Sequence, residues 1–238
     1  MPLTFAHPAV VLPFSRKSKY INFSALVLGS MAPDFEYFLR GQPLGEIGHT
    51  WMGFFLFNLP LVAAIYFIYH IFMHQTIVSH LPAFLQEPII HKVDSSRKLK
   101  VIVFCYSALF GMLTHVVWDS FTHMHGYMVI HFPILAQTFD IYGHNIPLYK
   151  FLQHGSTLVG IIAIIGYMYF RALLLGRKKG NVNAKQKLLF WSSVFLLTIF
   201  TAFLWNFVDY VSIISYGILV VRIIDSFLVS LLIISVKT

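Results

Sequence analysis

Long apolar stretches separated by short basic clusters dominate this sequence. Hydrophobic residues make up 58% of its 238 positions and charged residues only 11%, a balance far outside that of soluble globular domains. About 20 consecutive apolar residues cross a bilayer as a helix, and five stretches reach or approach that length: residues 51–73, 101–118, 157–175, 188–208 and 211–236. Because lipid satisfies no backbone polar group, spanning segments of this kind are expected to be helical. The sequence therefore predicts an all-α, polytopic membrane protein.

The N-terminal region is less regular. Residues 20–32 form an apolar segment that is short for a full crossing, and residues 35–39 would have to extend it to give a sixth span. Residues 5–14 are too short to cross, and His7 followed by Pro8 is typical of a first helical turn. We therefore expect about six apolar helices.

We interpret residues 1–238 as a single integral membrane domain, because no repeat, low-complexity tract or second soluble domain is present. Residues 1–126 carry the polar motifs of a candidate metal site. Residues 127–156 form an interfacial loop, and residues 157–238 hold three C-terminal transmembrane helices.

The basic residues predict an orientation and explain the formal net charge of +8. Lys and Arg gather in the connectors 92–100 and 177–187, which predicts that both lie on the cytoplasmic side. Alternating crossings then place residues 34–50, 119–156 and 209–210 at the opposite face. Because topology accounts for the basic residues, we expect the lipid bilayer as a partner and no nucleic acid.

The most informative polar residues follow the apolar stretch 101–118. His115, Asp119 and His123 lie at intervals of four residues, which places their side chains on one face of a helix over successive turns. Imidazole and carboxylate together form a ligand set that Zn²⁺ prefers, and such groups at the end of a membrane helix need a reason. The alternative is that each is only capped, solvated or hydrogen-bonded.

Other acidic and imidazole groups share the predicted face of Asp119 and His123. These are Asp34, Glu36 and His49. The orientation is predicted from Lys and Arg alone, so their occurrence at the same face favours one shared site. Asp34 can instead act as a helix-capping carboxylate. We expect Glu36 either to be solvated or to contact and orient a residue that ligates the metal.

Three further features bear on function. Arg222 and Asp225 lie three residues apart inside the last apolar stretch, which favours a structural ion pair over an anion site. Asp209 is predicted at the site face, as a spare ligand or a helix-end charge. Cys105 is the only cysteine, which excludes an intramolecular disulfide and a CxxC metal site.

These motifs resemble a known family. The opening MPLTFAHP, the segment GSMAPDFEYFLR, a His-Thr pair and the segment THVVWDSFTHMHG are similar to an uncharacterised family of bacterial integral membrane proteins with a domain of unknown function. More distantly, they resemble YdjM-type inner-membrane metal-dependent hydrolases. The order of His and Asp is also similar to that in zinc-dependent phospholipase C and P1-type nucleases.

The resemblance implies a set of metal ligands: His7, Asp34, His49, His115, Asp119 and His123. It implies that the two aspartates act in catalysis, by bridging metal ions or accepting a proton, and that the protein is a multi-pass protein of the inner (cytoplasmic) membrane. The soluble zinc enzymes add a later His-x3-Glu pair that this chain lacks. One or two divalent ions, zinc by preference, are therefore expected instead of three.

For an enzyme with these groups we expect metal-dependent hydrolysis of a phosphoester, with a lipid headgroup as substrate because the site lies at the membrane face. One alternative is a non-catalytic membrane protein with a structural metal, for which a closed four-ligand shell is typical. The other is a metal or proton transporter, which needs ionisable residues through the bilayer. Only His115, Arg222 and Asp225 lie at such depth, and six candidate ligands favour two ions and catalysis.

Overall fold

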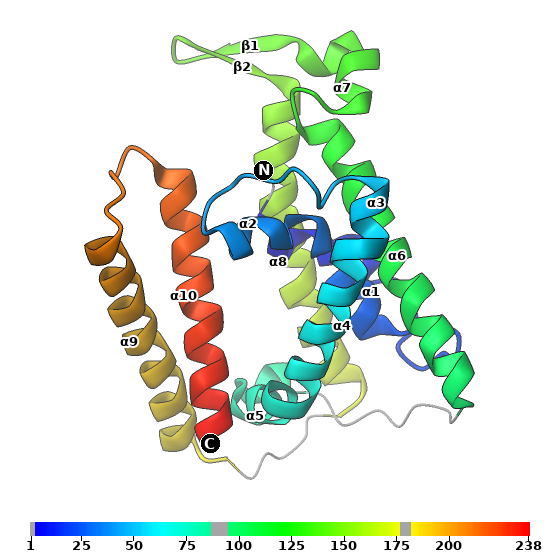
Figure 1. Cartoon of the computed structure of the whole chain (residues 1–238), viewed down its shortest axis with the longest axis vertical. Coiled ribbons are helices and arrows are strands. Elements are labelled where there is room, and N and C mark those ends of the chain that lie inside the picture. Colours follow the sequence, from blue (N-terminus) through cyan, green and yellow to red (C-terminus); the bar gives the residue numbers. More distant parts are fainter. Residues whose placement is uncertain (1–2, 87–94, 177–181) are drawn as a thin grey trace. The chain divides into compact units, whose positions relative to one another are not determined.

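A computed structural model of the chain describes residues 3–86, 95–176 and 182–238. Within them, five helices are long and apolar enough to cross a membrane (Figure 1): Trp51–His80, Arg97–His131, Leu148–Leu174, Ala184–Val208 and Tyr216–Lys237. This confirms the prediction of an all-α, multi-pass membrane protein, with five long helices close to the expected six. Residues 92–94 and 177–181, which belong to the basic connectors used to predict the orientation, lie outside the described residues.

The first long helix is a continuous series of shorter elements. They are α3 (Trp51–Gly53), η3 (Phe54–Asn58), α4 (Leu59–Ile68), η4 (Tyr69–Met73) and α5 (His74–His80), of which η3 and η4 have π-helical geometry. The other long helices are α6 (Arg97–Thr122), which α7 (Tyr127–His131) follows, then α8 (Leu148–Leu174), α9 (Ala184–Val208) and α10 (Tyr216–Lys237).

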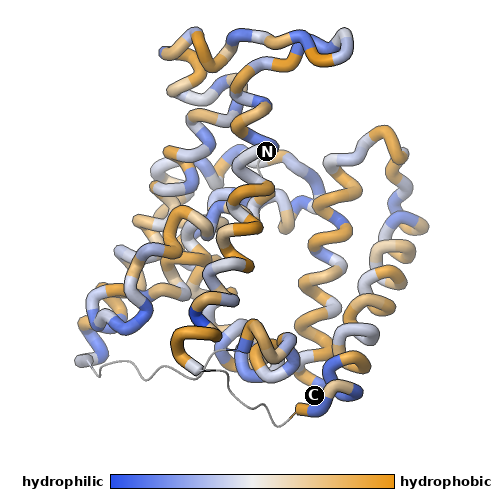
Figure 2. Tube along the Cα trace, turned by 180° about the vertical axis from the view of Figure 1, so that it is seen from behind, coloured by the Kyte–Doolittle hydropathy of each residue, from blue (hydrophilic) through white to orange (hydrophobic). Residues whose placement is uncertain are grey.

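Large apolar side chains cover the outside of these helices. Leu188, Phe203 and Phe207 on α9 are examples, each more than two-thirds exposed. Figure 2 shows hydrophobic residues along most of the length of α9 and α10. A soluble protein rarely exposes apolar surface on this scale, so these helix surfaces fit lipid.

Residues 20–39 do not form one spanning helix. They fold as α1 (Phe23–Gly29), the 3-10 helix η2 (Ala32–Asp34) and α2 (Phe35–Arg40). Pro33 causes the break, because proline lacks the backbone N–H and disfavours helical geometry in the residue before it. Residues 35–39 therefore do not extend the apolar segment 20–32, which explains why five long helices are found.

Contacts divide the chain into two compact units. Of the described residues, unit 1 comprises those within Met1–Pro33, His49–Val62 and Ile90–Tyr167, and unit 2 comprises those within Asp34–Gly48, Ala63–Ile89 and Met168–Thr238. Unit 2 contains the packed pair α9 and α10, with an apolar core around Phe190, Val194 and Leu231.

In unit 1, α1 packs closely against α6, and the 3-10 helix η1 (Thr4–Val11) contacts both. Two glycines permit this approach. A Cβ at Gly29 would overlap the backbone oxygen of Ala108, and a Cβ at Gly111 would overlap that of Leu26. Small residues allow helix backbones to approach in membranes in the same way. The close packing brings the N-terminal segments of unit 1 against the middle of α6.

The loop between α6 and α8 contains a hairpin of β1 (Thr138–Ile141) and β2 (His144–Pro147), paired antiparallel with Asp140 opposite Asn145. Figure 1 shows this hairpin beyond the ends of α6 and α8. Tyr142 and Gly143 form its two-residue turn, and both have positive φ, which suits the twist of a tight hairpin.

Candidate metal centre

Three separate segments of unit 1 bring histidines to one carboxylate. His7 lies in η1, His49 precedes α3, and α6 carries His115 and Asp119 one turn apart. His123 follows the end of α6 with an extended backbone. The carboxylate on which they converge is that of Asp119.

Each oxygen of Asp119 faces two imidazoles. Oδ2 lies 3.3 Å from Nε2 of His115 and 3.8 Å from Nε2 of His49. Oδ1 lies 3.5 Å from Nε2 of His7 and 3.6 Å from Nδ1 of His123. Ligand atoms about 2.0–2.1 Å from a tetrahedral Zn²⁺ are about 3.3 Å apart. These separations therefore suit atoms that share a cation.

The hydrogen bonding of His115 fixes which ring nitrogen faces Asp119. Its Nδ1 lies 2.8 Å from the backbone oxygen of Ser30, and because a carbonyl oxygen only accepts, Nδ1 is the donor. In the neutral ring, Nε2 then presents a lone pair to the carboxylate of Asp119. A histidine that ligates a metal has this same arrangement, with its other nitrogen donating to a carbonyl.

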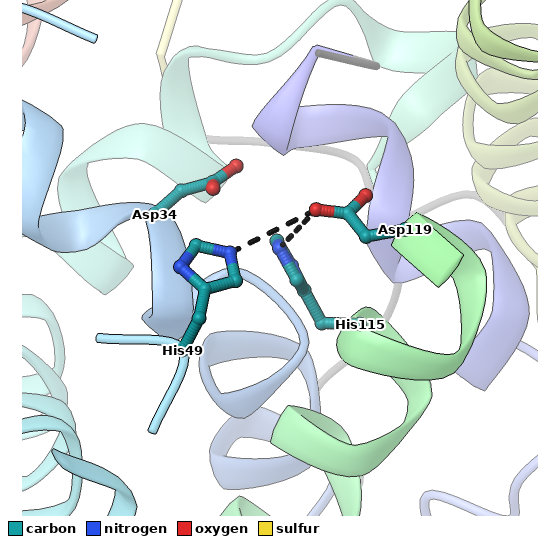
Figure 3. Close-up of side chains that lie close together, drawn as sticks. All are labelled: Asp34, His49, His115 and Asp119. Carbon is teal, nitrogen blue, oxygen red and sulfur yellow. Dashed lines mark ion pairs between the residues drawn. The ribbon is translucent and has the colours of Figure 1, made fainter. Parts of the chain in front are cut away.

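Asp34 ends η2 and directly follows Pro33, the last residue of the first segment of unit 1. Its side chain is fully buried. One ligand atom each from Asp34, His49, His115 and Asp119 lie within 4.8 Å of one another, and Figure 3 shows these side chains directed toward a common space. This cluster can hold a metal ion, as predicted from the sequence.

His7 and His123 stand at the edge of this group. The His7 ring stacks on His115 with a centroid distance of 3.9 Å and reaches the other oxygen of Asp119. His123 approaches with Nδ1, which also lies 3.1 Å from the backbone oxygen of Asp119. That nitrogen therefore donates to a backbone carbonyl. The helix α6 ends at Thr122, so His123, which the spacing placed on a third helical turn, directly follows the helix.

The side chain of Glu36 is buried, which excludes the solvated alternative and agrees with the other one, a group that supports a ligand residue. Oε2 accepts the backbone N–H groups of Glu46, Ile47 and Gly48 at 2.8–3.0 Å. Oε1 accepts from the guanidinium of Arg40 at 2.8 and 2.9 Å. Glu36 thereby fixes the backbone that leads directly into His49. Its sequence signal is modest: a carboxylate followed within twelve residues by three glycines, Gly41, Gly45 and Gly48.

These contacts change the acidity of Glu36. Burial raises the pKa of this carboxyl, but the three backbone donors and the guanidinium outweigh it and lower the pKa from 4.5 to about 2. Because the folded-state pKa lies below the ordinary value, the carboxylate stabilises the fold above about pH 4.5. That contribution is lost as the pH falls toward 2.

The predicted pair of Arg222 and Asp225 is wrong. Arg222 instead forms an ion pair with Asp209, and it also donates to the backbone oxygen of Asp209. Among the residues that the structure describes, no ion pair joins Arg222 to Asp225. The reason is that α9 and α10 pack together, which brings Asp209, just after α9, to Arg222. Asp209 is thus the partner of Arg222 in unit 2.

The polar residues of the loop after α6 have local roles. Asp140 accepts the N–H of Gly143 at 2.9 Å and closes the hairpin turn. Nδ1 of His131 donates to the backbone oxygen of Tyr127 at 2.8 Å. His125 and His144 are exposed. None of these four residues belongs to the cluster of ligand atoms found in the described residues.

The comparison with protein families agrees with the motifs. The family described as a domain of unknown function, DUF4184, matches residues 1–236. No curated protein and no solved structure matches the chain. The more distant resemblances, to YdjM-type hydrolases and to the zinc-dependent phospholipase C and P1 nuclease group, therefore stay predictions. Since the match spans nearly the whole chain, the protein belongs to the DUF4184 family.

Proposed function

We propose that this protein is a divalent-metal-dependent hydrolase that cleaves phosphoesters at one face of the inner (cytoplasmic) membrane. The observation that supports the proposal most strongly is the carboxylate of Asp119, each oxygen of which faces two imidazoles. Carboxylate and imidazole ligands suit zinc. The distant resemblance to metal-dependent hydrolases supports the same chemistry.

The ligand set favours catalysis over a closed structural site. A structural zinc needs four protein ligands, and Asp34, His49, His115 and Asp119 supply that number. His7 adds a fifth candidate ligand, 3.5 Å from Asp119. The site therefore holds more ligand groups than one closed structural shell uses. The alternative function, a structural metal in a non-catalytic membrane protein, would use the four-residue cluster alone. No contact described above favours a transporter.

In the proposed reaction, water adds to phosphorus, the ester P–O bond breaks, and the leaving alkoxide takes a proton. A bound divalent cation supplies a nucleophile from water near neutral pH and offsets phosphate charge. His49 and His115 would hold the cation through Nε2. Asp119 would hold it through Oδ2, while Oδ1 lies 3.5 Å from Nε2 of His7. Asp34, fully buried beside them, would take the proton of the attacking water.

The metal content of the detergent-purified full chain tests this proposal. We expect about one or two equivalents of zinc in the wild type and a loss of metal in Asp119→Asn and His115→Ala. His131→Ala, an exposed histidine of the loop, is the matched control and should keep its metal. Hydrolysis of bis(p-nitrophenyl) phosphate should follow metal content across these variants. Wild-type protein that holds no metal in buffers free of chelators would overturn the proposal.

A further inference from the structure

A groove in unit 1 adjoins the candidate metal centre. It has a volume of about 520 Å³, within the range of about 300–1,000 Å³ that is usual for ligand sites. Residues of η1, α6 and α8 line it, and nearly all the lining is apolar. Among the residues that line it are His7, Val10, Trp118, Phe151, Gly155 and Val159.

Contacts between three elements shape the groove. On one side Nε1 of Trp118 donates to Oγ of Ser156 at 3.3 Å, which links α6 to α8. On the other side the N–H of Leu3 donates to Oγ1 of Thr157 at 3.0 Å, which links the segment before η1 to α8. Further along α8, a Cβ at Gly160 would lie 2.9 Å from the backbone oxygen of Ala6. The packing of η1, α6 and α8 therefore forms the groove.

His7 belongs to both the groove and the metal centre. It lines the groove, while its Nε2 lies 3.5 Å from Oδ1 of Asp119. Trp118, the other groove residue from this region, directly precedes Asp119. The groove also lies in the parts of α6 and α8 that are nearest to the loop joining them, within two candidate membrane spans. An apolar chain in the groove would therefore place a polar headgroup beside Asp119.

From this geometry we infer that the groove binds one fatty acyl chain of a phospholipid, so that the substrate is a membrane lipid phosphoester. The inference rests on the proposed function for the identity of the reaction, but the binding site stands on its own geometry. Because the groove lies within two candidate membrane spans, an acyl chain there exchanges contacts with lipid for contacts with the apolar lining, and close packing between the chain and the lining holds it. The cation at the adjoining centre would attract the phosphate.

Gly155 provides a direct test of the groove. A Cβ at this position meets no atom within 4 Å, so a larger side chain can enter the groove without displacing its walls. Gly155→Leu should fill space that the acyl chain would occupy, so the chain should be excluded from this part of the groove. Gly166, on the same helix and also with open space around its Cβ, does not line the groove, so Gly166→Leu is the matched control.

The measurement is photolabelling of the full chain in nanodiscs of phosphatidylglycerol, with a phosphatidic acid that carries a diazirine in its palmitoyl chain. Mass spectrometry of the peptides should place the label on η1 and on residues 151–163. Labelling there should be lost in Gly155→Leu and stay unchanged in Gly166→Leu. Label spread evenly over the lipid-facing helices of the wild type would overturn the inference, whether or not the variant folds. So would equal groove labelling in Gly155→Leu and the wild type.

Labelling needs neither metal nor turnover, so its failure is distinct from failure of the proposed reaction. Groove labelling in a protein that binds no metal would support the lipid site and overturn the hydrolase. Conversely, hydrolysis of water-soluble bis(p-nitrophenyl) phosphate with evenly spread label would support the hydrolase and overturn the acyl groove. In an active enzyme, Gly155→Leu should raise the KM for the long-chain lipid and leave the KM for bis(p-nitrophenyl) phosphate unchanged.

Discussion

Nε2 of His115 lies 3.3 Å from Oδ2 of Asp119, one turn further along α6, while Nδ1 of the same ring donates to the backbone oxygen of Ser30. A neutral imidazole in this position presents a lone pair to a carboxylate, and two acceptors that face each other are unfavourable in a buried site. Either a metal cation or a second proton on His115 relieves the conflict. In the first case added metal stabilises the fold, and in the second case it does not.

The first prediction separates a metal from a proton at His115. Added zinc should stabilise the wild type by about 2.7 kcal/mol when its free concentration is about 100 times the Kd, and thermal unfolding followed by fluorescence would report it. Asp119→Asn keeps the shape of the side chain but removes its charge, so this variant should show no such stabilisation. A wild-type unfolding temperature that neither zinc nor a chelator changes would contradict the metal interpretation.

The second prediction concerns the two oxygens of Asp119. The Oδ2 side faces His49 and His115, whereas the Oδ1 side offers His7 and a nitrogen of His123 that already donates to a carbonyl. We expect one tightly bound ion on the Oδ2 side and weaker binding on the Oδ1 side. In a zinc titration by calorimetry, His7→Ala should lose only the weaker phase, and His49→Ala should weaken the tight one. Loss of the tight phase in His7→Ala would contradict this assignment.

The third prediction tests Glu36 as the anchor of the segment before His49. Glutamine has one acceptor oxygen and an NH₂ group that cannot accept. In Glu36→Gln this NH₂ therefore faces other donors, either the backbone N–H groups or the guanidinium of Arg40. His49 should then be less well positioned, and zinc affinity should fall about 10- to 100-fold, as when groups that orient metal ligands are removed.

The matched control for Glu36 is Glu46→Gln. The side chain of Glu46 is 78% exposed and also contacts Arg40, at 3.5 Å, so it shares the partner without the buried anchoring role. Zinc affinity in this variant should stay at the wild-type value. Equal zinc affinities in Glu36→Gln and Glu46→Gln would show that Glu36 does not position His49.

Helical periodicity predicted part of this site well. The four-residue spacing of His115 and Asp119 is a local property of one helix, and the structure places their side chains together. The helix ends at Thr122, one residue before His123, but Nδ1 of His123 still lies 3.6 Å from Oδ1 of Asp119. Hydropathy likewise located the five long helices, but Pro33 ended the extension of the segment 20–32 that a sixth crossing required.

Contacts between distant segments could not be read from spacing. The role of Glu36 depends on backbone N–H groups ten to twelve residues away. The glycines between them indicate a loop but do not show which way its N–H groups point. Arg222 pairs with Asp209, thirteen residues back, and not with the nearer Asp225, because the packing of α9 on α10 decides the partner. Metal identity depends on ligand geometry around an ion, which residue order alone does not specify.

The last prediction links helix packing to the metal centre through Gly111. A Cβ here would overlap the backbone oxygen of Leu26 and lie 2.7 Å from the backbone nitrogen of Ser30. Both atoms are backbone, so α1 has to move away from α6 to admit a methyl group. Overpacking of this kind costs about 1–3 kcal/mol, so Gly111→Ala should unfold at a lower temperature than the wild type.

The same displacement should reach His115, since the carbonyl of Ser30 accepts its Nδ1 proton. We therefore expect Gly111→Ala to lose zinc affinity as well as stability. Gly166→Ala, with no atom within 4 Å of its Cβ, is the control, and it should match the wild type or gain about 0.5–1 kcal/mol from the better helix propensity of alanine. Wild-type zinc affinity in a destabilised Gly111→Ala would show that the position of Ser30 does not govern His115.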